Sequence, residues 1–157
     1  MKLKSAALAA AVLTVAGLGA SVPTAGAQEA GALAVNNCNG TMTSDNNMGS
    51  FYTRIPAYVS KTGSTTHRYS RCNMAQGANG DHVKALQRIL NNCYARGLTV
   101  DGDFGANTKK GLEYAQRLAS PSVTVDGVWG PNTLHGVNLP GFDSNGQFNG
   151  HCYSQVY

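Results

Sequence analysis

The sequence predicts an all-α fold, a small three-helix bundle in which two similar Asp-Gly corners each start a helix. Apolar residues recur at helical spacing over residues 81–97 and again over residues 106–119. A stretch built around Asp-Gly occurs twice, at residues 98–108 and 123–133, and a helix start follows each copy. The segments on either side are rich in Gly, Asn and Ser, so we expect irregular extensions that disulfides tie down.

Residues 1–27 have the pattern of a secretory signal peptide. A basic start precedes an alanine-rich apolar run, which leads to a small-x-small site at Ala25-Gly26-Ala27. The run is shorter than the roughly 20 residues of a membrane-spanning helix, which disfavours a retained anchor. We expect cleavage after Ala27, a mature chain of 130 of the 157 residues and no membrane attachment afterwards.

The mature chain is expected to be nearly neutral. Lys2 and Lys4 would leave with the signal peptide, so 10 basic and 8 acidic side chains would remain, a net charge of +2. This balance gives no support to nucleic-acid binding.

Residues 28–73 are expected to form the irregular N-terminal extension. Its second part, residues 51–71, interleaves aromatic and basic side chains, and no acid occurs between Asp45 and Asp81. Pro56 favours extended backbone in the residue before it, so short extended pieces are expected. These residues could approach an anionic ligand. We favour the alternative, a cover whose tyrosines pack on the helices, because charges on alternate faces of extended segments are usually solvated.

Two long helices follow. The first should begin after Gly80, which with Asp81 is a stop and N-cap candidate, and should close at Gly97. Its apolar stripe consists of Val83, Leu86, Leu90 and Cys93. The second helix, residues 106–119, should turn four side chains inward, namely those of Leu112, Ala115, Leu118 and Ala119.

A third, shorter helix should begin at Pro131, whose fixed φ suits a first helical position, and should run to about Val137. Residues 138–157 form the C-terminal tail. Because the tail is rich in Gly and Asn, its order is expected to depend on Cys152.

The two corners agree at seven positions when they are aligned at an offset of 25. In each copy the Asp is expected to bind backbone N–H groups of the turn, the next Gly to take a positive φ, and the second Gly to cap the helix. An aromatic residue stands between the two glycines, Phe104 in one copy and Trp129 in the other. The matched pairs are Thr99/Thr124, Val100/Val125, Asp101/Asp126, Gly102/Gly127, Gly105/Gly130, Asn107/Asn132 and Thr108/Thr133.

All four cysteines lie beyond the predicted signal peptide. Four cysteines, an even number, in an exported chain indicate two disulfides. A metal site would need close pairs such as C-x-x-C, and the sequence has none. Three pairings are possible, and the residues alone do not choose between them.

Three motifs at residues 74–137 resemble the peptidoglycan-binding domain of the three-helix type, which occurs in bacterial cell-wall hydrolases and spore-cortex enzymes. The motifs are "MAQGANGDHVKALQ", "DGDFGANT" and "DGVWGPNT", in the family's order and spacing. The matching residues are Met74, Gly77, Gly80, Val83, Leu86, Gln87, Asp101, Gly102, Phe104, Gly105, Thr108, Asp126, Gly127, Gly130 and Thr133. The overall layout is similar to small exported proteins of actinobacteria. Gly111 departs from the family, which commonly has Ala there, and an interior Gly weakens a helix by about 0.5 to 1 kcal/mol.

The same layout implies a disulfide pairing. Cys72 and Cys93 flank the first helix and are expected to pair with each other, which leaves Cys38 with Cys152 to clamp the two extensions together. The rival pairing joins Cys72 to Cys152 and would staple the start of the domain to its end.

The resemblance implies an exported, non-catalytic module that binds bacterial peptidoglycan and is extracellular or associated with the cell wall. Its candidate ligand-binding residues are Phe104, Trp129, Asp101, Asp126, Tyr114 and Arg117. Corner geometry is the favoured role for both Asp residues, and a core position is favoured for Phe104. For Trp129, a core position and an exposed ring that stacks on a sugar are equally supported. A solvated helix face is favoured for Tyr114, Gln116 and Arg117 over the border of a groove.

No catalytic, cofactor or metal site is predicted. The four histidines stand singly along the sequence, the cysteines are expected to be oxidised, and Asp101 and Asp126 are expected to serve their turns. In an alternative of a different class, the scaffold serves protein interaction, as an exported inhibitor or accessory of a cell-wall hydrolase or protease. Residues 38–73 and 138–157 would then be its working surface.

Overall fold

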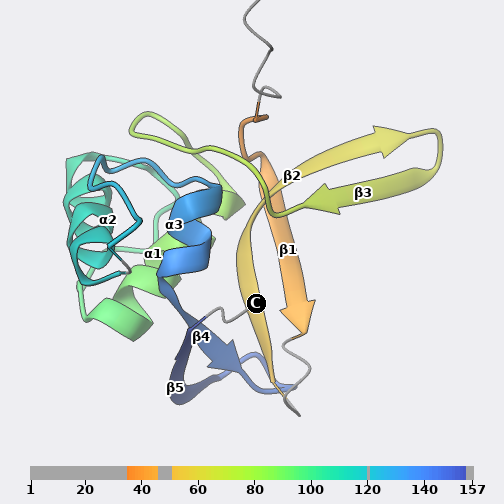
Figure 1. Cartoon of the computed structure of the whole chain (residues 1–157). Helices are drawn as coiled ribbons and strands as arrows, with labels where there is room; N and C mark the ends of the chain where they lie inside the picture. The colour runs from red at the N-terminus through yellow and green to blue at the C-terminus, as the bar shows by residue number, and fades with distance from the viewer. Residues whose placement is uncertain (1–34, 46–50, 120, 155–157) are drawn as a thin grey trace, which may run out of the picture. The chain divides into compact units, whose positions relative to one another are not determined.

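The prediction of an all-α three-helix bundle is wrong, because both extensions contribute strands to one sheet. In the computed structural model, a five-stranded antiparallel sheet accompanies the helices (Figure 1). Its strands are β1 (Gly40–Asp45), β2 (Tyr52–Thr62), β3 (Thr65–Tyr69), β4 (Asn138–Phe142) and β5 (Phe148–Ser154).

The structure describes residues 35–45, 51–119 and 121–154, and residues 33–157 group into one unit. The predicted signal peptide, residues 1–27, lies outside the described residues. Within the described part of the chain, no helix is long and apolar enough to cross a membrane.

Strand β2 is the longest strand and changes partner along its length. Its first half pairs with β1, from Tyr52 to Ala57, and its second half pairs with β3, from Tyr58 to Thr62. Strand β4 joins the other edge of β2 at Tyr52 and pairs in turn with β5. The second half of β2 and β3 therefore form a hairpin that extends away from the helices (Figure 1).

The strands lack the alternating apolar pattern that identifies strands in a sequence. Strand β1 is almost entirely polar, β3 is exposed at every residue, and β4 contains Pro140 and Gly141. Their pairing is long-range, since β2 meets β4 through Tyr52 and Phe142. Such strands form because they pair with strands that are distant in the sequence. The local sequence does not reveal these partners.

The helices lie where the sequence predicts them: α1 (Asp81–Tyr94), α2 (Ala106–Leu118) and α3 (Pro131–Gly136). Gly80, Gly105 and Gly130 are their N-caps, as expected. Helix α1 ends three residues before Gly97, because Ala95 takes a left-handed conformation with φ of 51°. The inward position predicted for Leu118 is wrong, since its side chain is 63% exposed.

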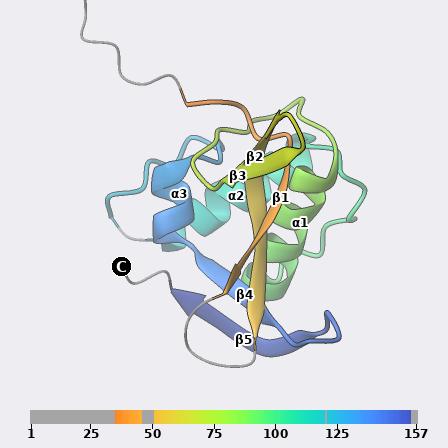
Figure 2. The ribbon, with the colours of Figure 1, turned by 90° about the vertical axis from the view of Figure 1, so that its right-hand side faces the viewer.

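The core lies where α1 meets the sheet and the two corners. Helix α1 contacts β1, β2, β4 and β5 as well as α2, and β1 and β2 lie against it (Figure 2). The largest fully buried side chains are those of Trp129 and Phe104. They belong to one buried cluster with Val83, Leu86, Ile89 and Leu90 of α1 and with Leu112, Ala115, Leu134, Val137 and Leu139.

Two disulfides are present, but both predicted pairings are wrong. Cys38 pairs with Cys72, and Cys93 pairs with Cys152. Cys72 lies in the segment before α1 and Cys93 lies in the last turn of α1, and each is already bonded to another cysteine, so the predicted Cys72–Cys93 bond does not form. The bonded Cα atoms are 5.0 and 5.7 Å apart, within the usual range for a disulfide. The first bond closes the N-terminal extension on itself, and the second ties the C-terminal tail to α1.

Loss of either disulfide should lower the free energy of unfolding. The bonds close separations of 34 and 59 residues, and chain entropy then gives about 4 kcal/mol for each. Denaturant titration of the double variants Cys38→Ser/Cys72→Ser and Cys93→Ser/Cys152→Ser measures these losses. Non-reducing peptide mapping of the wild-type chain checks the pairing, and a fragment that links Cys72 to Cys93 would contradict it.

Candidate functional site

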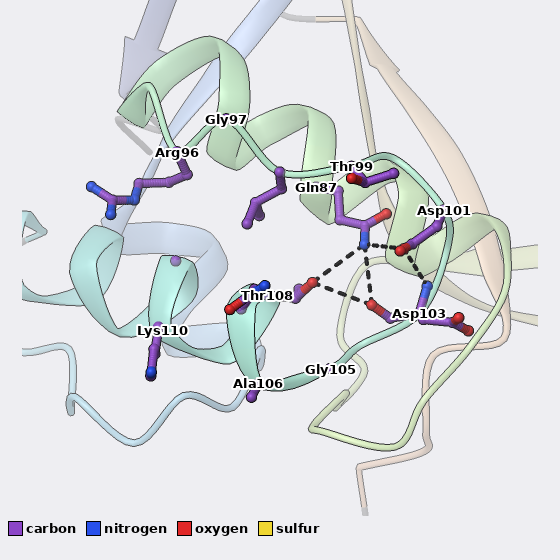
Figure 3. Close-up of a pocket in the computed structure, with 13 residues that line it drawn as sticks. Gln87, Arg96, Gly97, Thr99, Asp101, Asp103, Gly105, Ala106, Thr108 and Lys110 are labelled. Carbon is purple, nitrogen blue, oxygen red and sulfur yellow. Dashed lines mark hydrogen bonds between the residues drawn. The ribbon is translucent and has the colours of Figure 1, made fainter.

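A buried glutamine on α1 holds the first corner, residues 98–108. The side-chain amide of Gln87 donates to Asp101 Oδ1 at 2.7 Å, to the Asp103 carbonyl at 3.1 Å and to Thr108 Oγ1 at 3.3 Å. Its oxygen accepts the Gly102 N–H at 3.0 Å. Figure 3 shows the three bonds that the Gln87 nitrogen donates, to Asp101, Asp103 and Thr108. Both ends of the amide are therefore used, as a buried amide requires.

Gln116 on α2 repeats this arrangement at the second corner, residues 123–133. Its amide donates to Asp126 Oδ1 at 2.9 Å, to the Val128 carbonyl at 3.0 Å and to Thr133 Oγ1 at 3.1 Å. Its oxygen accepts the Gly127 N–H at 2.9 Å. We call each of these networks a glutamine clamp. The solvated helix face favoured for Gln116 is wrong, because this residue is only 2% exposed. Gln116 also lines neither of the surface grooves described below, and its role is structural.

Within each corner the Asp and Gly residues act as predicted. Asp101 accepts the N–H of Asp103, and Asp126 accepts the N–H of Val128, two residues further on in each case. Gly102 and Gly127 have φ of 86° and 68°, which only glycine adopts readily. Both carboxylates are exposed at the surface, so they shape their turns and also remain open to solvent.

A connecting segment, residues 72–80, pairs with both corners through the backbone. Met74 exchanges two hydrogen bonds with Trp129, each of 2.8 Å. The Phe104 carbonyl accepts from Gly77, and the Phe104 N–H donates to Ala78. The segment therefore fixes the aromatic residue of each corner by its main chain.

The aromatic rings themselves are buried, with 2% of Phe104 and none of Trp129 exposed. Neither ring offers a face to a ligand, so the sugar-stacking role considered for them does not fit the structure. Both are core residues because the corner turns them inward between its two glycines. Replacing Trp129 by Ala would therefore report on folding rather than on ligand binding.

Each corner borders a groove with a volume of about 460 Å³. The first groove lies beside residues 98–108 and the second beside residues 123–133. Seven lining positions of the first recur in the second at an offset of 25: Thr99/Thr124, Asp101/Asp126, Asp103/Val128, Gly105/Gly130, Ala106/Pro131, Asn107/Asn132 and Thr108/Thr133. The sequence repeat therefore builds two related surface cavities.

The first groove combines hydroxyl, amide and carboxylate groups with two cations. Arg96 and Thr99 lie on its α1 side, and Lys110 projects from α2 on the other side (Figure 3). The guanidinium of Arg96 lies over the ring of Tyr114, with its carbon 4.2 Å from the ring centroid. Tyr114 thus serves the groove by positioning Arg96 rather than by lining it.

Gly111 lies on the floor of the first groove, which accounts for its departure from the family pattern. A Cβ at this position would meet Leu90, Leu98 and Arg96 at 3.3 to 3.5 Å. The missing methyl group leaves room for the loop that carries Arg96.

Of the predicted site residues, the structure brings Asp101 to the first groove and Asp126 to the second. Arg117 is exposed on α2 and lines neither groove. Sequence reasoning missed Arg96, Lys110 and the clamp role of Gln87. The one available signal was a glutamine in the helical stretch before each Asp-Gly corner, 14 residues before Asp101 and 10 residues before Asp126. Among the described residues, no group of three or more His, Cys, Asp or Glu could hold a metal ion.

The part of the chain that carries both corners and the first groove is the part that matches a known family. Residues 79–135 match the family described as a putative peptidoglycan binding domain. This match confirms the resemblance drawn from the three motifs. The five strands lie outside the matched residues, so the sheet is not part of the segment that is similar to this family. A search of curated proteins and a search of solved structures each found no match.

The clamps should be essential for stability. Gln87→Glu and Gln116→Glu keep the side-chain shape but remove both donated hydrogens and place a second carboxylate beside Asp101 or Asp126. Each change should lower the free energy of unfolding by about 3 kcal/mol or more, measured by denaturant titration. Gln76→Glu is the matched control, because Gln76 is exposed. Equal stabilities of the clamp variants and the control would rule out this role.

The first corner should weaken in acid. The N–H of Asp103, and then the Gln87 amide, hold the pKa of the Asp101 carboxyl below its usual value of 3.8. Because the folded-state pKa is lowered, the stabilisation is complete above the unfolded-state pKa and is lost as pH falls through the folded-state pKa. The stability difference between wild type and Asp101→Asn should thus be constant above about pH 5 and should shrink below the usual pKa. An NMR titration of the Asp101 carboxyl at or above 3.8 would contradict this expectation.

Proposed function

We propose that this protein is an exported, non-catalytic module that binds bacterial peptidoglycan, with the first groove as its main contact. The family match carries the proposal, because it covers both corners and all the residues that line that groove. Two disulfides support a location outside the cytoplasm, where such bonds persist, in keeping with the signal peptide predicted at residues 1–27.

The chemistry of the first groove suits this polymer. Peptidoglycan joins a glycan rich in hydroxyl and acetamido groups to peptide stems that end in carboxylates. Arg96 and Lys110 form no ion pair with any described residue, so both are open to an anionic group. Thr99 and Asn107 supply neutral donors and acceptors between them. A cation pair beside neutral polar groups can bind a stem carboxylate and an amide together.

A single groove is expected to bind its ligand weakly. Such binding can hold the protein on the cell wall only because the ligand is repeated many times there. The groove is open and its lining is a nearly even mixture of polar and apolar surface, so a ligand would bury only a modest apolar area. Peptidoglycan presents many identical units on one insoluble surface, and a second engaged site on the same chain would raise the overall affinity.

Co-sedimentation with insoluble peptidoglycan tests the proposal. Wild type is expected in the pellet, and Arg96→Gln should weaken binding about tenfold, because it removes a charge-assisted hydrogen bond. Arg117→Gln is the matched control, since Arg117 is exposed outside both grooves. Lys110→Gln should resemble Arg96→Gln.

Absence of the wild-type chain from the pellet would overturn peptidoglycan binding and favour the alternative, an exported protein that binds another protein. Equal binding by Arg96→Gln and Arg117→Gln would move the contact away from the first groove. The non-catalytic part of the proposal predicts that incubation with purified cell wall releases no soluble fragments, and their release would contradict it.

A further inference from the structure

The β2–β3 hairpin carries an aromatic pair on one face. Tyr58 and Tyr69 are directly opposite each other in the register, with ring centroids 6.2 Å apart. Tyr58 packs partly against the core, whereas Tyr69 is 50% exposed. His67, two residues before Tyr69 on the same face, stacks on the Tyr69 ring with centroids 6.4 Å apart. The hairpin was expected to cover the helices, but its outer strand leaves these rings open to solvent.

The hairpin is fixed at its base by side chains. The Asn39 side chain donates to the Val59 carbonyl at 3.0 Å and accepts the Val59 N–H at 2.7 Å, which continues the strand pairing beyond β1. Arg68 donates to the Thr41 carbonyl at 2.8 Å from β3. The tyrosine pair adjoins these anchors, so its position relative to the corners is set before any ligand binds.

Arg71 joins this face to the second groove. A cavity of about 330 Å³ is lined by the tyrosine pair, Asn36, Ser60 and Arg71. Arg71 also lines the second groove, next to Asn73 and the start of α3. The two cavities therefore share one cation, and together they run from the hairpin to the second corner.

Charge favours an anionic group at Arg71. The sequence has no acid between Asp45 and Asp81, and Arg71 forms no ion pair among the described residues. Its guanidinium presents a planar fork that matches a carboxylate. The half-exposed ring of Tyr69, two residues before Arg71, lines the same cavity, and it offers the apolar body and polar tip that suit a sugar ring.

We propose that the hairpin extends the second groove into a second site, which takes a saccharide bearing a carboxylate. The sugar ring lies on Tyr69, the carboxylate pairs with Arg71, and the remainder of the ligand follows the groove beside Asn132 and Thr133. This inference rests on the proposed function, since it assigns a second contact with the same polymer. The hairpin lies outside the family match, so the site belongs to the strands that this chain adds.

Calorimetric titration of the full chain with a soluble disaccharide-peptide from peptidoglycan tests the proposal, in an Arg96→Gln background that weakens the first groove. Tyr69→Ala and Arg71→Gln should each weaken the remaining binding at least fivefold. Tyr69→Phe should keep it, because the ring face is retained. Lys61→Gln, an exposed cation near the hairpin turn that lines neither cavity, is the charge-matched control. Circular dichroism checks that each variant is folded.

A neutral oligomer of N-acetylglucosamine separates the two contacts. Its binding should depend on Tyr69 and should not respond to Arg71→Gln, because it has no carboxylate. If Arg71→Gln and Tyr69→Ala bind the disaccharide-peptide as well as Lys61→Gln does, the second site is overturned. The first groove remains supported in that case if Arg96→Gln by itself weakens binding. If wild type binds neither ligand nor insoluble peptidoglycan, the proposed function itself fails. Binding that Tyr69→Ala leaves intact and added salt abolishes would indicate simple charge attraction and would also overturn the site.

Discussion

The rest of the structure depends on the side-chain amides of two buried glutamines, Gln87 and Gln116, which play the same role at the two corners. In each copy the side-chain nitrogen and oxygen satisfy the backbone and the carboxylate of an Asp-Gly corner, and the corner then starts the next helix. The first clamp joins α1 to α2 and the second joins α2 to α3. A buried amide is stable only when its partners are all in place, so each clamp ties helix order to one particular turn geometry.

The three helices form only a small scaffold, and the sheet and the disulfides stabilise it. Helix α1 is the common element, because it carries Gln87 and its last turn is bonded to the C-terminal strands. Cys93 is linked to Cys152 on β5, and the hydroxyl of Tyr94 accepts the N–H of Asn138 at 2.7 Å. At the other end, Cys38 and Cys72 fix the connecting segment that pairs with both corners. The added strands thus brace the same corners that border the grooves.

The helices and corners could be predicted from the sequence because their signals are local. Each helix is signalled by its own helical spacing and by the glycine at its N-cap. Each Asp-Gly corner is likewise recognised from a short run of neighbouring residues. The sheet could not be predicted, since strands such as β3 are exposed on both faces and owe their existence to distant partners. The disulfide pairing failed for a related reason, because it depends on which extension lies beside which end of α1. Arg96 was missed as a groove residue because its place follows from a turn that Asn91 holds by two hydrogen bonds to Leu98.

The two grooves follow from the same repeat, which connects the fold to its proposed role: two similar corners present related but different surfaces to a polymer that is itself repetitive. Amide chemical-shift mapping of the full chain with a soluble peptidoglycan disaccharide-peptide tests this connection most directly. Chemical-shift changes are expected at residues 99–108, at residues 124–133 and at Arg71. Shifts confined to surfaces outside both grooves, or no shifts at a ligand concentration that saturates binding, would contradict it.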